Sequence, residues 1–303
     1  MVRREPKHFR YGIIVGTDIK EQRDTSAGDV LDDRLLDIFR LLEQAPVQDV
    51  QTILDIGAGQ CHLAKHFASL GKKVTCTGVA IDSYVSDIPG LRVRYGIEYV
   101  ECDIEHMPFA EGSFDAVVMC HVLEHCQDVS RSLRHARRML REDGLLLIFV
   151  PPQEDVVCAG HVSTGWNVGQ LMYVLLLNGF DIRNGNFIRY GYNICGFARR
   201  SEQSLPELRF DSGDITLLAR GGFFPLPIGY DGFGDNFNGN IKSVNWPNVS
   251  KYMMSAQSTP LKRIFYKVIA RVPQSIRMPL GNFLLKLGRL LTAFSVDNAD
   301  RLV

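Results

Sequence analysis

A predicted strand that ends beside an acid and is followed by two glycines is the segment of this sequence best suited to bind a ligand. The run Ile53-Leu54-Asp55-Ile56 predicts a buried strand, and Gly57-Ala58-Gly59 predicts a tight turn after it. Apolar residues recur over 62–70 with the period of a helix that packs back on the strand. Glycine adopts positive φ at little cost and has no side chain, so such a turn exposes backbone N–H groups. The spacing predicts a site for phosphate, a dinucleotide or a sulfonium cofactor.

Strands that alternate with helices surround this turn. The predicted strands cover residues 53–56, 72–81, 99–102, 114–120, 145–150, 180–188 and 193–199, the last two forming an antiparallel hairpin at the sheet edge. The predicted helices cover residues 29–42, 62–70, 129–140 and 165–177, and Gly144 is expected to end the third. This order predicts an α/β fold with a doubly wound, mostly parallel sheet. Ligands of such sheets lie at the carboxyl ends of the strands.

The composition is that of a soluble globular protein. Of 303 residues, 46% are hydrophobic and 22% are charged, and 34 basic residues balance 34 acidic ones, so nothing indicates a nucleic-acid partner. The 7 cysteines include no Cys-x-x-Cys pair, so we expect neither a disulfide framework nor a metal site, and a cytoplasmic location. The N-terminus lacks an apolar signal core, and the run 171–177 is too short to span a bilayer.

Several segments in order resemble the motifs of one cofactor-binding family. A Gly-x-Gly-x-x-Gly dinucleotide turn would carry glycine at His62, which argues against NAD. The spacing Asp55-x-Gly57-x-Gly59 instead resembles the first motif of the class I S-adenosylmethionine-dependent methyltransferases, with Cys61 at the usual third glycine. Segments that resemble later motifs of that family cover residues 99–109, 112–118, 121–125 and 138–148. The resemblance spans about residues 52–199, and it implies a Rossmann-like methyltransferase fold that binds S-adenosylmethionine across the ends of strands one to four.

The resemblance implies that the glycine turn holds the methionyl part of the cofactor. Gly57, Ala58 and Gly59 would close on it, because its carboxylate suits exposed N–H donors. Its ammonium suits Asp55 or a backbone carbonyl. Asp82, the nearest acid after the predicted second strand, would accept both ribose hydroxyls. The family usually has that acid at the place of Ala80, so the alternative is that another group holds the ribose.

The ends of the third and fourth strands complete the implied cofactor site. Asp103 and Ile104 form the adenine-edge pair, the carboxylate for the exocyclic amine and the backbone N–H for a ring nitrogen. Cys120 and His121 follow on the fourth strand, where His121 would meet the cofactor through its backbone.

Two histidines are the predicted catalytic residues. Methyl transfer is an in-line displacement, so holding donor and acceptor at near-attack distance supplies several kcal/mol. A hydroxyl acceptor also needs a base, and histidine fits because its unperturbed pKa is about 6.5. His161 follows the fifth predicted strand, where this family often brings its acceptor, and His125 follows the fourth. The alternative for each is a solvated or structural loop histidine.

The C-terminal third differs in composition from the rest. Residues 201–258 are dense in Gly, Pro, Asp and Asn and predict loops, and residues 260–294 carry two amphipathic helical patterns. From Lys251 to Val303 there are nine Lys or Arg residues against two acids. One apolar and one basic face suit peripheral contact with an anionic membrane, and a domain cap or a homodimer interface is the alternative. We therefore predict an N-terminal flap and helix (1–44), a cofactor domain (45–200) and an accessory region (201–303).

The leading functional hypothesis is methyl transfer to an oxygen of a sugar, glycan or lipid-linked glycan. Residues 190–197 and 213–215 are loosely similar to methyltransferases found with bacterial surface-glycan synthesis. Another small metabolite is the second choice of acceptor. A NAD-dependent oxidoreductase and a non-catalytic scaffold with a cofactor fold are the alternatives of other classes.

Overall fold

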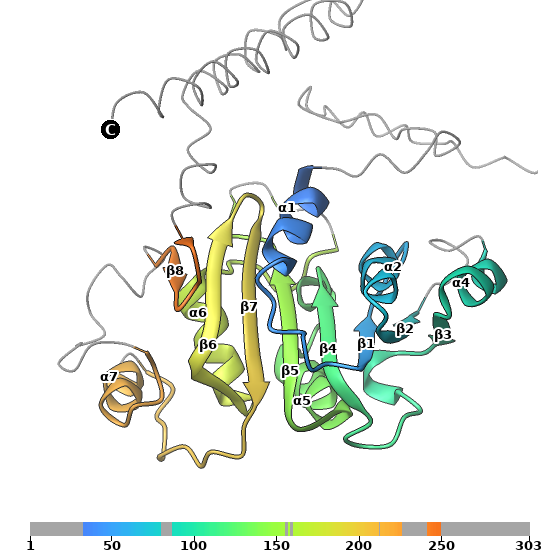
Figure 1. Ribbon diagram of the computed structural model, residues 1–303. Helices are drawn as coiled ribbons and strands as arrows, with labels where there is room; N and C mark the ends of the chain where they lie inside the picture. Colours follow the sequence, from blue (N-terminus) through green and yellow to red (C-terminus); the bar gives the residue numbers. More distant parts are fainter. Residues whose placement is uncertain are drawn as a thin grey trace, which may run out of the picture.

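A mixed sheet is the centre of the protein (Figure 1), and the computed structural model describes residues 33–79, 87–154, 157, 160–211, 213–225 and 241–249. Within them the strand order is β3-β2-β1-β4-β5-β7-β6-β8. The strands are β1 Thr52–Ile56, β2 Lys73–Gly78, β3 Glu98–Glu101, β4 Phe114–Cys120, β5 Leu140–Val150, β6 Phe180–Tyr190, β7 Asn193–Arg200 and β8 Ser243–Val244. β1 to β5 pair in parallel, and β6, β7 and β8 are antiparallel to their neighbours.

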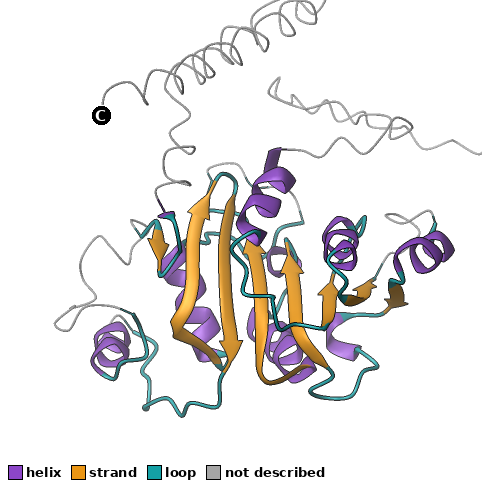
Figure 2. Ribbon diagram, in the orientation of Figure 1, coloured by secondary structure: helices purple, strands orange, loops and turns teal. Residues whose placement is uncertain are grey.

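Helices cover both faces of this sheet (Figure 2). They are α1 Asp33–Leu42, α2 His62–Ser69, α4 Ile88–Tyr95, α5 Val129–Met139, α6 Val168–Leu177 and α7 Gly213–Arg220, with short 3-10 helices η1 Ile104–His106 and η2 Leu123–His125. Buried residues of α1, α2 and α4 pack in one hydrophobic core, and those of α5, α6 and α7 pack in the other. The predicted doubly wound, mostly parallel α/β fold is confirmed.

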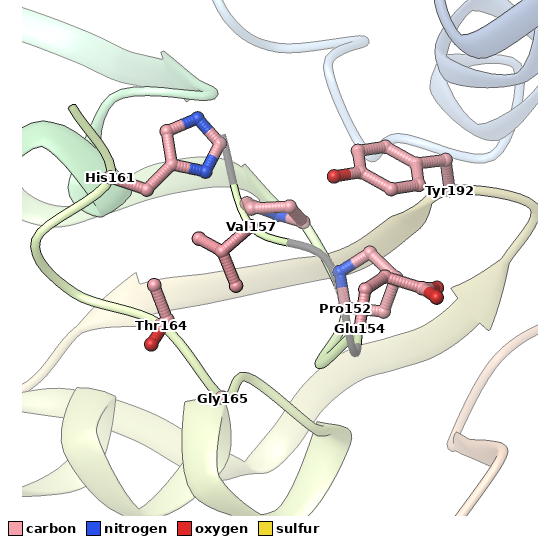
Figure 3. A pocket seen from close by; sticks show the side chains of 8 residues that line it. Pro152, Glu154, Val157, His161, Thr164, Gly165 and Tyr192 are labelled. Carbon is pink, nitrogen blue, oxygen red and sulfur yellow. The ribbon is translucent and has the colours of Figure 1, made fainter. Parts of the chain in front are cut away.

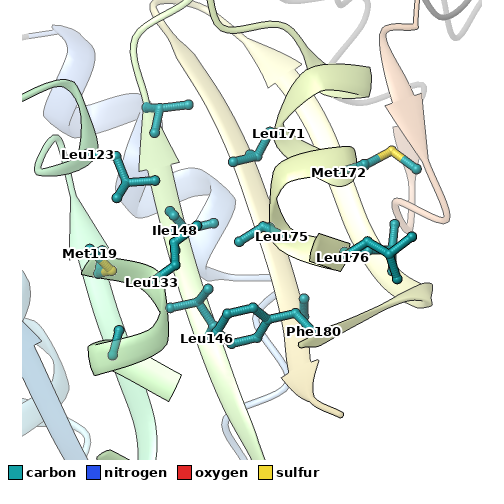
Figure 4. Packing of buried hydrophobic residues seen from close by; sticks show 14 of the residues in the cluster. Met119, Leu123, Leu133, Leu146, Ile148, Leu171, Met172, Leu175, Leu176 and Phe180 are labelled. Carbon is teal, nitrogen blue, oxygen red and sulfur yellow. The ribbon is translucent and has the colours of Figure 1, made fainter. Parts of the chain in front are cut away.

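The apolar runs of the central strands follow from this double cover. Successive side chains of a strand point to opposite faces. In β4, Val117 and Met119 pack in the core beneath α5 and α6, whereas Val118 packs in the core beneath α1 and α2. Leu171 and Leu175 of α6 point from the helix toward the strands (Figure 4). A strand that is buried on both faces is apolar throughout, so its sequence shows no alternation of apolar and polar residues.

The C-terminal hairpin lies where it was predicted, but it is not the sheet edge. β7 pairs with β5, and β6 pairs on its other side with β8, through Phe187 with Val244 and Ile188 with Ser243. β8 was not predicted, because two residues inside a Gly- and Asn-rich stretch carry no strand pattern. Trp246 follows β8 and packs on Phe197 of β7, with ring centroids 5.0 Å apart.

The prediction that Gly144 ends the third helix is wrong. α5 ends at Met139, and β5 begins at once with Leu140, which pairs with Phe114. The pairing then shifts, since the next partners are Ala116 and Leu145. Gly144 belongs to this irregular segment: a Cβ there would lie 2.9 Å from the backbone oxygen of Arg141. Glycine is needed for the close backbone approach at a bulge.

Several predicted features lie outside the described residues. They are the N-terminal flap, Asp82 and the amphipathic stretches of residues 260–294. The division into three domains stays a prediction, although α1 and α7 both pack in the cores of the sheet. None of the helices within the described ranges is long and apolar enough to cross a membrane.

Candidate functional site

The candidate site lies along the edge where β1, β2, β3, β4 and β5 end. These strands are parallel, so their carboxyl ends share one edge of the sheet. The glycine turn follows β1, and the segment with His121 and His125 follows β4. The sheet therefore brings together segments about 65 residues apart in the chain.

The turn after β1 has the backbone that its glycines predict. Gly57 has φ +67° and Gly59 has φ +49°, and the N–H of Ala58 donates to the carbonyl of Thr77 in β2 at 3.0 Å. A Cβ on Gly57 would lie 2.7 Å from a methyl of Val122. Glycine is required at this position, because the turn after β1 packs directly against the segment after β4.

Gly59 faces open space. A Cβ built on it meets no heavy atom of the described residues within 4 Å. Cys61, at the family's usual third glycine, also has positive φ, +59°, and caps α2 without a side-chain hydrogen bond. The turn thus keeps the left-handed conformation at Cys61 without a glycine, at a cost of roughly 1–2 kcal/mol. A glycine with positive φ and no neighbouring side chain is suited to a ligand cradle, because the backbone can approach the ligand closely.

Asp55 is buried beneath this turn, with 3% of its surface exposed. Its carboxylate accepts a hydrogen bond from the backbone N–H of Ala64, one of the N–H groups that begin α2. Burial raises the pKa of Asp55 to about 7, and the Ala64 N–H opposes that shift. The carboxylate anchors α2 to β1. Its predicted contact with the cofactor ammonium stays a prediction.

The predicted adenine pair lies just past the end of β3. Asp103 is exposed and caps η1, because its Oδ1 accepts from the N–H of Glu105 at 2.8 Å. Ile104 is half-buried and packs against the core beneath α5. The N–H of Cys102 donates to the carbonyl of Gly78 at the end of β2. Asp103 and Ile104 thus stand beside the end of β2, and their roles toward adenine stay predictions.

The end of β4 is strained at His121. Cys120 is the half-buried last residue of the strand, and His121 has φ +54°, which is uncommon outside glycine. Its N–H donates to the carbonyl of Phe149, and its ring nitrogens contact Glu124 Oε1 and Asn193 Oδ1, each at 2.9 Å. Because Glu124 and Asn193 contact both ring nitrogens, the backbone contact predicted between His121 and the cofactor does not need the imidazole, and that contact stays a prediction.

The structure brings the two predicted catalytic histidines together. The rings of His125 and His161 lie edge to face, with centroids 4.8 Å apart. Two hydrogen bonds hold this arrangement, since the N–H groups of Val162 and Ser163 donate to the carbonyl of Glu124 at 2.7 and 3.1 Å. The segment after β5 is therefore docked on η2, although 36 positions separate the two histidines in the chain.

A pocket lies next to this histidine pair (Figure 3). Its lining residues are Pro151, Pro152, Glu154, Val157, His161, Thr164, Gly165 and Tyr192. His161 and Tyr192 lie on opposite sides of it. The pocket thus brings an imidazole, a phenol and two hydrogen-bonding side chains together at the end of β5.

Three residues of the site were not predicted from the sequence: Glu124, Tyr192 and Asn193. Glu124 and Asn193 are buried and hold the imidazole of His121, and the Tyr192 ring stacks on it with centroids 6.3 Å apart. The pattern His121-x-x-Glu124-His125 was the available signal for Glu124. No local sequence pattern indicates Tyr192 and Asn193, which the β6–β7 hairpin brings to the site.

Comparisons with known proteins agree with the cofactor prediction. Residues 54–148 match a family described as a methyltransferase domain. A relative from Mycobacterium tuberculosis named as an S-adenosylmethionine-dependent methyltransferase is 30% identical over 143 residues, 45% of this chain and 51% of that one. The ubiquinone/menaquinone biosynthesis C-methyltransferase UbiE of Hahella chejuensis is 30% identical over 177 residues, 52% of this chain and 71% of that one.

Solved structures include similar chains. The 1,6-didemethyltoxoflavin-N1-methyltransferase of Burkholderia thailandensis is 18% identical, with a TM-score of 0.43 over 50% of this chain and 71% of that one. The chain spans about half the length, 51%, of the first relative above.

Proposed function

This chain belongs to the class I S-adenosylmethionine-dependent methyltransferases, and we propose that it transfers a methyl group to an oxygen of a sugar, glycan or lipid-linked glycan. The proposal rests on one observation. The glycine turn after β1 touches Val122, which immediately follows His121 and leads into the histidine pair. A cofactor cradle and an acceptor pocket therefore meet at one edge of the sheet.

The residues of the turn suit the cofactor. When bound, S-adenosylmethionine supplies a methyl group activated by a sulfonium. Gly57, Ala58 and Gly59 would face its methionyl part, because a glycine turn at the end of a strand can present backbone N–H groups to an anion, and a Cβ on Gly59 would meet no described atom within 4 Å. Asp103 and Ile104 would hold the adenine, beside the end of β2.

The acceptor pocket favours a substrate with hydroxyl groups. Glu154, Thr164 and Tyr192 offer hydrogen-bonding groups around it, and His161 can take the proton that a hydroxyl loses on methylation. A second candidate is an aromatic carbon acceptor, which the likeness to a quinone C-methyltransferase favours. Both reactions need a base beside the acceptor, so the histidine pair does not separate them.

Binding and turnover measurements test the proposal. Titration calorimetry of the full chain is expected to give heat with S-adenosylmethionine and none with NAD; the reverse result would leave the oxidoreductase alternative. Release of S-adenosylhomocysteine with glycans, lipid-linked glycans, small polyols and quinone precursors then identifies the acceptor. Cofactor binding without turnover on any of these classes would favour the scaffold alternative.

His161→Ala is expected to lower turnover roughly 100-fold on the acceptor found, the scale of a lost acid–base group, and to keep cofactor affinity. His161 lines the acceptor pocket, whereas the glycine turn binds the cofactor. His135→Ala is the matched control, because His135 lies on α5, outside the pocket. Unchanged turnover in His161→Ala would remove this residue from the reaction.

The basic stretch 260–294 is the second part of the proposal. Its two amphipathic patterns suit peripheral contact with an anionic membrane, which would bring the enzyme to a lipid-linked acceptor. Flotation of the full chain with anionic and with neutral liposomes tests this. Binding to neither removes the membrane contact, and a homodimer found by light scattering would assign the stretch to an interface.

A further inference from the structure

Three metal-ligating side chains meet between η2 and the segment after β5. Glu124, His125 and His161 each place one ligand atom within 4.8 Å of the other two. The sequence predicted no metal site, because its cysteines include no Cys-x-x-Cys pair. We propose that these three residues form a binding site for one divalent transition-metal ion, beside the acceptor pocket.

Glu124 gives the strongest indication of a bound cation. It is 1% exposed, and its Oε1 contacts His121 Nδ1 at 2.9 Å. Its Oε2 is buried and receives no hydrogen bond from any described residue. A buried carboxylate oxygen without a donor is costly, so native proteins rarely keep one. A cation between Glu124 and the two imidazoles would satisfy it.

Hydrogen bonds to neighbouring groups position the proposed ligands. His125 Nδ1 contacts the carbonyl of Gly160 at 3.3 Å, which leaves Nε2 for an ion. Ser163 Oγ donates to the carbonyl of Cys126 at 3.1 Å, so the segment that carries His161 is tied to both sides of His125. Hydrogen bonds from imidazole to backbone carbonyl, and from imidazole to a ligating carboxylate, are the usual outer partners of metal ligands.

The spacing allows coordination with a small movement. Tetrahedral ligands about 2.1 Å from an ion lie roughly 3.4 Å apart. In the structure the ligand atoms of Glu124, His125 and His161 lie within 4.8 Å of one another. Rotation of the exposed His125 side chain can bring them to the shorter spacing. Three ligands leave a coordination position open, as in catalytic rather than structural zinc sites.

The donor set defines the class of ion. Two imidazoles and one carboxylate suit Zn²⁺, Co²⁺ or Fe²⁺, whereas Mg²⁺ and Ca²⁺ prefer oxygen ligands throughout. His161 also lines the acceptor pocket, so the ion would lie next to the acceptor. With His161 as a ligand, the ion would replace its imidazole in the proposed role of base, because a hydroxyl bound to such an ion loses its proton more readily. This role rests on the proposed methyl transfer, but the metal site itself does not.

Co²⁺ titration of the full chain, freed of metal by a chelator, tests the site. We expect one equivalent of Co²⁺ to bind and to give a visible absorption band typical of nitrogen and oxygen ligands. Zn²⁺ should compete with Co²⁺ for the site, and Mg²⁺ should not. Glu124→Gln, His125→Ala and His161→Ala should each weaken Co²⁺ binding at least tenfold, because changes to outer partners alone cost roughly 10- to 100-fold. His135→Ala should bind as the wild type does.

His125 keeps the test valid if another variant fails to fold, since it is exposed. Equal Co²⁺ affinity in His125→Ala and wild type would overturn the site, as would the lack of a one-to-one complex. Methyl transfer at full rate by the chelator-treated enzyme would overturn the ion's role in the reaction. Co²⁺ binding without cofactor binding would instead contradict the proposed function and leave the site in place.

Discussion

Gly59→Ala is expected to weaken binding of S-adenosylmethionine roughly 5- to 150-fold while the protein still folds. An alanine Cβ at this position meets no described atom within 4 Å, so it would project into the space left for the ligand. Overpacking of this kind costs about 1–3 kcal/mol, and each 1.4 kcal/mol is a factor of ten in affinity. Titration calorimetry measures the change directly.

Gly71→Ala separates ligand contact from backbone strain. Gly71 follows α2 with φ +77°, and it too has no neighbour within 4 Å of an added Cβ. Both variants pay the same left-handed penalty of roughly 1–2 kcal/mol in stability. Only Gly59→Ala should bind the cofactor more weakly than the wild type. Equal affinities in the two variants would mean that the cofactor does not approach Gly59.

The fold was predictable because its signals are local. β4 was predicted with its observed bounds, since seven residues of a doubly covered strand are almost all apolar. Gly144 shows the limit of such signals. The same glycine can end a helix or permit a bulge, and only the pairing of β5 with β4 decides between them.

The candidate site likewise has a part that was predictable from the sequence and a part that was not. The glycine turn was predictable, because positive φ limits the residue types at Gly57 and Gly59. The cluster around Glu124 was not, since its geometry depends on pairings that are distant in sequence. Asn193 contacts His121 across 72 positions, and His161 reaches His125 only through the docked segment after β5. The two histidines were predicted from their places after the fourth and fifth strands, and only the fold brings the Glu124 carboxylate close to both of them.

Asp55→Asn is expected to remove a pH dependence of stability of about 3 kcal/mol between pH 5 and pH 8. Burial raises the pKa of Asp55 from 3.8 in a model peptide to about 7 in the folded chain. The folded state then binds the proton more tightly than the unfolded state, so the stability that this residue contributes is complete below about pH 4. It is lost as the pH rises through about 7.

Urea unfolding at pH 5 and pH 8 tests this prediction. The wild type should lose about 3 kcal/mol more than Asp55→Asn between the two values, since one pKa unit corresponds to about 1.4 kcal/mol. Asp49→Asn, at an exposed carboxylate before β1, should follow the wild type. Parallel curves for the wild type and Asp55→Asn would show that Asp55 does not titrate in this range.

The same carboxyl group should couple to the cofactor. An ammonium facing Asp55 favours the ionised carboxylate, so bound S-adenosylmethionine would lower its pKa, and by linkage a higher pH would strengthen binding. We expect the wild-type affinity to rise about tenfold from pH 5.5 to pH 8, and that of Asp55→Asn to stay flat. If both profiles are flat, the ammonium contacts a backbone carbonyl instead, and Asp55 acts only by anchoring α2 beneath the turn.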